Sequence, residues 1–215
     1  MKKLLLPLAA AALAACSALP QPPAQQTLYD FGPRSRQEQP QADLARAAAK
    51  AQAPLVLAGI KTSGLPDGGT PIFYRLAYAD ALQLKPYSQA RWARPAAQLI
   101  QQSLLSRLSE GRAVLESRDG AVQALSNGAN PAMLRLDVEE FSQVFSDTAT
   151  SQGLLRLRAT LTEVTPRGEK WLSQGVFTVQ RPAPTPDAAG GTQALVAATE
   201  EAGRQLDGWL QQLGR

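Results

Sequence analysis

Few residues of this 215-residue sequence are suited to catalysis or metal binding. It contains no histidine and one cysteine, which excludes histidine-ligated metal sites, Ser-His and Cys-His nucleophilic pairs and internal disulfides. A hydrolase would need the rarer Ser-Lys pair, for which Lys61 and Ser63 are the nearest candidates. The adjacent Glu139 and Glu140 point to opposite faces of a strand, so they cannot act together as an acid–base pair. We therefore predict no catalytic residue and no metal site.

Cys16 is the residue with the clearest predicted chemistry. It ends a segment that begins with two lysines and continues as an apolar run over residues 4–12. This run is too short to span a bilayer, which takes about 20 residues, and is typical of a cleaved secretory signal. The preceding Leu13-Ala14-Ala15 resembles the bacterial lipobox, in which the cysteine sulfur receives a diacylglyceryl group before cleavage and acylation of the new amino group. We predict a signal peptide over residues 1–15 and a covalent lipid on Cys16 as the only prosthetic group.

The residues after Cys16 bear on where the mature chain is held. The alternative to lipidation is an ordinary signal peptide with a cysteine at the cleavage site by chance. Under lipidation, Ser17 favours the outer membrane, because the bacterial sorting rule retains proteins with aspartate at this position in the inner membrane. Residues 16–26 include three prolines and no apolar period, which predicts a polyproline-like tether that can hold a domain up to about 30 Å from the bilayer. The predicted location is the periplasmic face of the outer membrane.

The rest of the chain, residues 27–215, has the composition of a single globular domain. The sequence is 44% hydrophobic and 19% charged, and its length allows one sizeable core. The formal net charge of +4 reflects 22 Lys and Arg against 18 Asp and Glu; loss of two lysines with the signal leaves 20 against 18, or +2. Such a small excess does not support nucleic-acid binding.

Alternating and periodic apolar residues predict the elements of this domain. In residues 154–164, leucines alternate with arginines and threonines, so one face of this strand is exposed to solvent. In residues 133–145 the alternation slips after Glu139, which predicts a bulge or a bend. The fold class is therefore α+β: an antiparallel sheet with two main helices packed on one face. Strands are predicted over residues 27–31, 55–60, 72–78, 82–92, 113–116, 133–145, 154–164 and 171–180, and helices over 95–108 and 195–213.

Basic and aromatic residues are interleaved around the third and fourth of these strands. Such a stretch could contact anionic lipid headgroups or an acidic partner, with its rings at the interface. Composition alone favours the alternative, in which the aromatic rings fill the edge of the core and the basic side chains are solvated. Trp92 in particular is expected to lie at least partly in the core, because a strand-to-helix junction needs a large apolar wedge. The candidate contact residues are Tyr74, Arg75, Tyr87, Arg91 and Trp92.

The order of these features resembles the ABC-type transport auxiliary lipoproteins, the group that includes the paraquat-inducible lipoprotein C type. Arg91-Trp92-Ala93 matches the family's Arg-Trp-Ala triplet before the first helix. The other matching segments are Leu28–Pro33 soon after the lipidated cysteine, Leu65-Pro66 and Ile72–Arg75. The resemblance extends from Thr27 to the last helix. The sequence departs from the family in a glycine-richer loop over residues 64–69 and in a longer Ala/Gln stretch after the first strand.

The resemblance implies a non-catalytic outer-membrane lipoprotein that serves a lipid transporter. Such systems pair an inner-membrane ABC permease and ATPase with a mammalian-cell-entry-domain protein that crosses the periplasm. The lipoprotein would dock that protein at the outer membrane, with a homo-oligomeric ring as one arrangement, and the partner would hydrolyse ATP because this chain has no Walker motif. Two other functions stay open: assembly of an outer-membrane barrel or of lipopolysaccharide machinery, and hydrolysis by Lys61 and Ser63.

Overall fold

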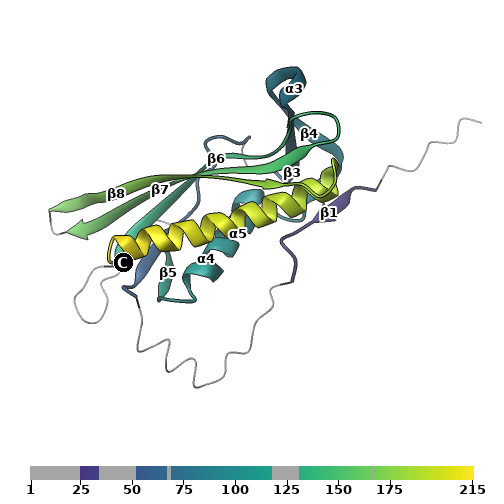
Figure 1. The fold of residues 1–215 in the computed structure, drawn as a ribbon. Helices are drawn as coiled ribbons and strands as arrows, with labels where there is room; N and C mark the ends of the chain where they lie inside the picture. The colour runs from purple at the N-terminus through teal and green to yellow at the C-terminus, as the bar shows by residue number, and fades with distance from the viewer. Residues whose placement is uncertain (1–24, 34–51, 67–68, 118–130, 166) are drawn as a thin grey trace, which may run out of the picture.

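The computed structural model describes residues 25–33, 52–66, 69–117, 131–165 and 167–215. These parts contain one sheet of eight strands and three helices (Figure 1). The strands are β1 (Thr27–Tyr29), β2 (Leu55–Ala58), β3 (Pro71–Leu76), β4 (Ala81–Trp92), β5 (Val114–Ser117), β6 (Ala132–Phe145), β7 (Ser151–Thr165) and β8 (Gly168–Pro182), and the helices are α3 (Ala77–Asp80), α4 (Ala96–Leu108) and α5 (Ala188–Gln212). The predicted α+β class is confirmed. The predicted signal peptide, tether and Cys16 lie outside the described residues.

The sheet is mostly antiparallel, as predicted, and is built around β6. Two long antiparallel ladders join β6 to β7 and β7 to β8. The β7–β8 turn closes at Thr165 and Gly168, and Gly168 has a φ of 113°, a conformation that favours glycine. On the other side of β6 the sheet branches, because the carboxyl half of β6 pairs with β3 and the amino half pairs with β2.

The branches contain parallel pairings that the sequence analysis does not anticipate. Both β3 and β2 run parallel to β6, and β5 runs parallel to β2. On the outer side of β3 lies β4, antiparallel to it, and β1 then runs parallel to the last residues of β4. The strand order across this part of the sheet is β1-β4-β3-β6-β2-β5.

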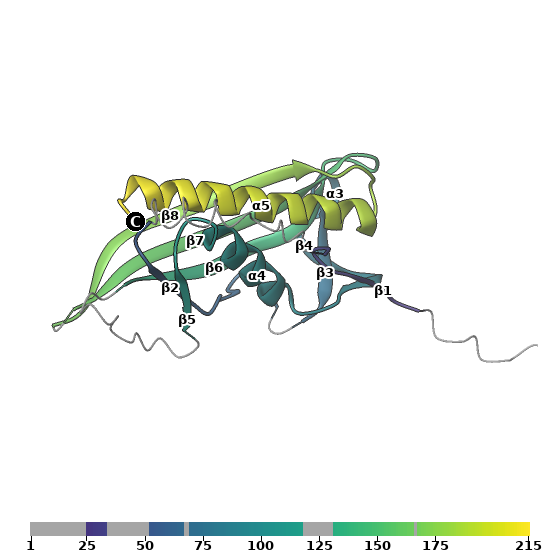
Figure 2. The same ribbon diagram turned by 90° about the horizontal axis from the view of Figure 1, so that it is seen from below.

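Both main helices cover the same face of the sheet (Figure 2). α5 packs against β6, β7 and β8, and α4 packs against α5. α4 begins directly after Pro95, and α5 begins after Asp187, whose carboxylate accepts the Gly190 N–H at 2.8 Å as an N-cap. Leu155, Leu157 and Leu161 of β7 are buried beneath the helices, while Arg156 and Arg158 lie on the opposite face. The predicted solvent-exposed face of this strand is confirmed.

A bulge in β6 and a helical turn between β3 and β4 position candidate residues. The predicted bulge is confirmed: the register of β6 against β7 shifts between Val138 and Glu140. The predicted strand 72–78 is shorter than expected, since β3 ends at Leu76 and the single helical turn α3 precedes β4. The Asp80 carboxylate accepts the Leu82 N–H at 2.9 Å, a local bond that favours a turn over continued strand pairing.

α5 approaches the backbone of the sheet closely at Gly153 of β7. A Cβ atom at this position would lie 2.6 Å from the carbonyl carbon of Ala194 and 2.7 Å from the Leu195 nitrogen. These are backbone atoms of α5, so no side-chain rotation can relieve the clash. A glycine at this point in β7 therefore sets how closely the helix lies on the sheet.

Gly153→Ala is expected to destabilise the protein by about 1–3 kcal/mol, because the added methyl group must displace α5 from the sheet. Gly208→Ala is the matched control, since a Cβ at Gly208 meets nothing within 4 Å and alanine is favoured over glycine inside a helix by about 1 kcal/mol. Urea unfolding should give free energies that change in opposite directions for the two variants. Equal stability of Gly153→Ala and the wild type would contradict the close approach.

Candidate functional site

The aromatic candidates lie in two separate clusters along the β3–β4 hairpin. Tyr74 and Tyr87 face each other with ring centroids 4.7 Å apart, and Tyr74 also meets Phe145 edge-on at 6.0 Å. The Tyr87 hydroxyl donates to Gln143 Oε1 at 2.7 Å. Burial, reinforced by the neighbouring Tyr74, raises the pKa of Tyr87 above its ordinary value. This half-buried pair links β3 and β4 to the end of β6.

Trp92 belongs to the core, which confirms the expectation for this residue. Its side chain is 1% exposed. The ring stacks on Phe141 at 5.8 Å and meets Phe31 edge-on at 5.6 Å. Because Phe31 lies two residues after the end of β1 and Phe141 lies on β6, Trp92 joins the segment after β1 and two strands just before α4. A contact of Trp92 with a partner would be indirect, through the position of these neighbours.

Arg75 is the candidate with the most extensive polar contacts. Its Nε and Nη2 donate to the two carboxylate oxygens of Glu140, at 3.2 and 2.9 Å. Its Nη1 donates to the carbonyl oxygens of Ala81 and Leu82, at 3.2 and 3.3 Å. One planar guanidinium thus ties the turn after α3 to the centre of the sheet. The sequence indicated a basic residue here but not this bridging role.

Arg91 turns back onto its own strand. Its Nη1 donates to the carbonyl oxygens of Tyr87 and, at 2.9 Å, of Ala90. The backbone of Arg91 pairs with Leu28 of β1. The five candidates are therefore not one surface, and their predicted role in contacts with a partner or another copy stays a prediction.

The face of the sheet opposite the helices carries paired charges. Glu139 accepts hydrogen bonds from Arg156 and Arg158, each at 2.6 Å, and these bonds lower the pKa of Glu139. Glu140 pairs instead with Arg75, so the two adjacent glutamates belong to separate ion pairs. This face is consequently polar, with its arginines and carboxylates compensating one another.

Ser63 is held by a carboxylate of the same face. Its Oγ lies 2.6 Å from both carboxylate oxygens of Asp137, and its backbone N–H donates to Oδ1 at 3.0 Å. The neighbouring Lys61 exchanges main-chain hydrogen bonds with Leu136 and Val138 of β6. These contacts close the loop after β2 onto the sheet, and they give Ser63 a structural partner. Within the described residues, no group of three or more metal-binding side chains occurs.

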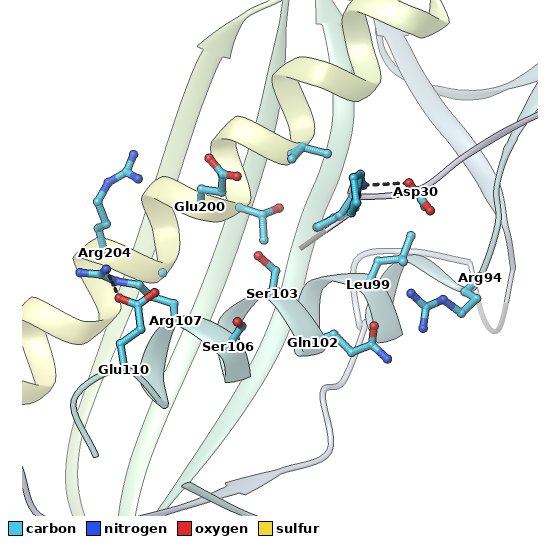
Figure 3. Close-up of a pocket in the computed structure, with 16 residues that line it drawn as sticks. Asp30, Arg94, Leu99, Gln102, Ser103, Ser106, Arg107, Glu110, Glu200 and Arg204 are labelled. Atoms are coloured by element: carbon cyan, nitrogen blue, oxygen red, sulfur yellow. Dashed lines mark hydrogen bonds and ion pairs between the residues drawn. The ribbon is translucent and has the colours of Figure 1, made fainter. Parts of the chain in front are cut away.

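A groove of about 360 Å³ lies between α4, α5 and the residues after β1 (Figure 3). Ser103 and Ser106 of α4 and Glu200 of α5 line it, and Arg107 pairs with Glu110 at one end. Small-molecule sites that hold an acyl chain have predominantly apolar walls. These polar walls therefore fit a water-filled groove better than a lipid-carrying cavity. The sequence analysis did not find this groove, because its walls come from three segments distant in the chain.

Comparison with known proteins assigns the chain to a family. A family model described as "ABC-type transport auxiliary lipoprotein component" matches residues 37–207. The chain belongs to the ABC-type transport auxiliary lipoprotein family. The predicted resemblance is thereby confirmed, and the protein is a lipoprotein component that assists an ABC transporter. No curated protein matches the sequence.

Two solved structures share the fold of this transport auxiliary lipoprotein. A protein from Xanthomonas campestris has a TM-score of 0.61 and 22% identity, over 77% of this chain and 89% of its own. An uncharacterized protein has a TM-score of 0.59 and 14% identity, over 86% of this chain and 99% of its own. At these identities the similarity shows the arrangement of the elements alone.

None of the described helices combines the length and the apolar character that crossing a bilayer requires.

Proposed function

We propose that this auxiliary lipoprotein is a non-catalytic outer-membrane anchor that docks the periplasmic subunit of an ABC-type lipid transporter. The observation that carries the proposal is the arrangement of the chain, with a lipobox cysteine at position 16 ahead of a domain that matches the family from residue 37 onward. The family supplies the link to an ABC transporter. Ser17 supports the outer membrane as the site of anchoring.

The structure of the domain supports an adaptor more than a carrier or an enzyme. The groove between α4 and α5 has polar walls, and the hydroxyl of Ser63 is bound to Asp137. The open face of the sheet presents fixed, paired charges such as those of Glu139 and its two arginines. A rigid polar face of this kind suits docking of a folded protein, since electrostatic complementarity contributes to specificity. The proposed partner is a mammalian-cell-entry-domain protein together with its permease and ATPase.

Purification of the tagged full-length lipoprotein from detergent-solubilised membranes tests this function. We expect the mammalian-cell-entry-domain protein and the ABC subunits to co-purify, in amounts comparable with the lipoprotein. The double variant Arg156→Glu and Arg158→Glu should reduce their recovery by about tenfold if the open face is the docking surface. Reversing these two charges would place like charges opposite one another at the interface, which lowers both specificity and affinity. Gln193→Glu, an exposed change on α5, which covers the opposite face of the sheet, is the control. Co-purification of an outer-membrane barrel in place of the transporter subunits would overturn the proposal.

A further inference from the structure

The turn between β3 and β4 exposes an unusual number of apolar side chains. We name residues Ala77–Leu82, which comprise α3 and the first two residues of β4, the apolar tip. The Leu82 side chain is 91% exposed, the largest value among the exposed large hydrophobic residues described, and Tyr78 is 48% exposed. The three alanines between and beside them are also exposed. Figure 1 shows α3 projecting beyond the edge of the sheet.

The apolar tip is held firmly even though its side chains are in solvent. Arg75 donates to the carbonyl oxygens of Ala81 and Leu82 while it is itself bound to Glu140. The Leu82 N–H donates to the Asp80 carboxylate. These backbone groups are therefore satisfied within the protein, which lowers the cost of moving them out of water. A turn that only faced solvent would not need these internal hydrogen bonds, because water would bond its backbone groups.

β1, the first strand after the predicted tether, runs from the direction of the apolar tip. β4 begins at the tip and runs away from it, and β1 runs parallel to β4, with Thr27 opposite Ala90. The amino end of β1 therefore points back toward the tip. Eight residue steps of β4 separate Ala90 from Leu82, which is at most about 26 Å because β4 is irregular between them. The eleven residues from Cys16 to Thr27 can extend about 34 Å as a polyproline-like chain, so a lipid on Cys16 and the tip can reach one bilayer.

We propose that the apolar tip inserts Leu82 and Tyr78 into the interfacial layer of the bilayer that holds the Cys16 lipid. This inference rests on the proposed lipid anchor. Leucine supplies an apolar side chain, and tyrosine supplies an amphipathic ring of the kind enriched at membrane interfaces. The acyl chains hold the protein in the membrane, while the tip fixes the orientation of the domain as a second point of contact. α5 and the groove then have defined positions relative to the bilayer.

Site-specific fluorescence on the full-length, lipidated protein tests the orientation. Cys16 is the only native cysteine and is blocked by lipid, so Leu82→Cys can be labelled with an environment-sensitive dye. Leu213→Cys is the control, because Leu213 is also an exposed leucine, at 39%, and the carboxyl end lies at the opposite end of the molecule from α3 (Figure 1). In vesicles of phosphatidylethanolamine and phosphatidylglycerol, we expect a blue shift and quenching by brominated lipid at position 82 only.

A second measurement separates the tip from the anchor. In the full chain with Cys16→Ser, sedimentation with the same vesicles should show weak binding that Leu82→Ser reduces by about tenfold or more, the effect expected for burying one leucine. Leu213→Ser should leave this binding unchanged. If mass spectrometry shows no lipid on the mature chain, the anchor fails, but this binding assay still tests the tip.

Two results would overturn the inference. One is equal, solvent-like fluorescence at positions 82 and 213 on vesicles that carry the lipidated protein. The other is a blue shift at position 82 that occurs only when a transporter subunit is added, which would make the apolar tip a protein contact.

Discussion

Replacing Cys16 with serine is expected to transfer the protein from the membrane fraction to the soluble periplasmic fraction. A serine hydroxyl at this position cannot form the thioether that carries the diacylglyceryl group, so the mature chain loses its acyl chains. Each buried CH₂ group of such chains contributes about 0.8 kcal/mol, and two or more chains give stable anchoring where one is marginal. Fractionation followed by immunoblotting measures the transfer. We expect nearly complete loss from the membrane, the largest functional effect of any single substitution considered.

Ser17→Asp is the matched control for this experiment. It keeps the lipidated cysteine, so total membrane association should not change, but the sorting rule predicts that the protein moves from the outer to the inner membrane. A thermal unfolding curve of Cys16→Ser should coincide with that of the domain in the wild type, because position 16 precedes β1 by more than ten residues. Retention of Cys16→Ser in the outer membrane would contradict both the anchor and the proposed docking function.

The sequence predicted those parts of the fold that local patterns determine. The alternation in β7 fixes which side chains face the helices, and Pro95 marks the start of α4. The last helix begins earlier than the predicted residue 195, because Asp187 caps α5 at Ala188. The slip in the pattern of β6 corresponds to a real bulge beside Glu140. These features depend on neighbours within a few residues, so they can be recognised without knowledge of the partner strands.

The parallel pairings could not be predicted in the same way. β2 is a run of four buried residues, and such a run is compatible with either strand direction. Its place beside β6 and β5 depends on contacts with residues far along the chain. The branching of the sheet also requires β6 to be long enough to pair with two strands on one edge, and only the folded chain shows this.

The candidate site shows the same division between local and distant information. The sequence indicates the interleaved basic and aromatic residues as candidates, but alternation along a strand places neighbours on opposite faces, so they separate in the fold. The bridging role of Arg75 depends on its ion pair with Glu140, which is 65 residues away. Leu82 was missed because it forms part of an apolar strand pattern, and only its position at the projecting end of β4 exposes it.

The buried ion pair between Arg112 and Asp207 is the clearest case of a contact that the sequence cannot show. The two residues are 95 positions apart, and the Arg112 side chain is 0% exposed. Among the described residues, Arg112 Nε and Nη1 have no hydrogen-bond partner. Asp207 of α5 therefore provides the main compensation for a positive charge that arginine cannot lose. The pair fastens the segment between α4 and β5 to α5.

Asp207→Ala is expected to destabilise the protein by about 3–5 kcal/mol, because it leaves an unpaired charge in the core. This is a large fraction of the total stability of an ordinary domain, about 5–15 kcal/mol, and corresponds to a fall in Tm of about 10 °C for a chain of this size. Calorimetry on the purified protein measures the change. Gln211→Ala is a suitable control, since it removes only the 3.0 Å hydrogen bond that Gln211 donates to Asp207, and should cost about 1 kcal/mol or less.

The double variant Arg112→Met and Asp207→Ala tests whether the loss of stability in Asp207→Ala comes from the unpaired charge of Arg112. Replacement of both members of a buried pair by apolar residues is often close to neutral, so the double variant should be more stable than Asp207→Ala alone. If the charge were instead reached by water, the two substitutions would act independently and their effects would add. Recovery of stability on removing Arg112 would show that mutual neutralisation holds the segment between α4 and β5 to α5.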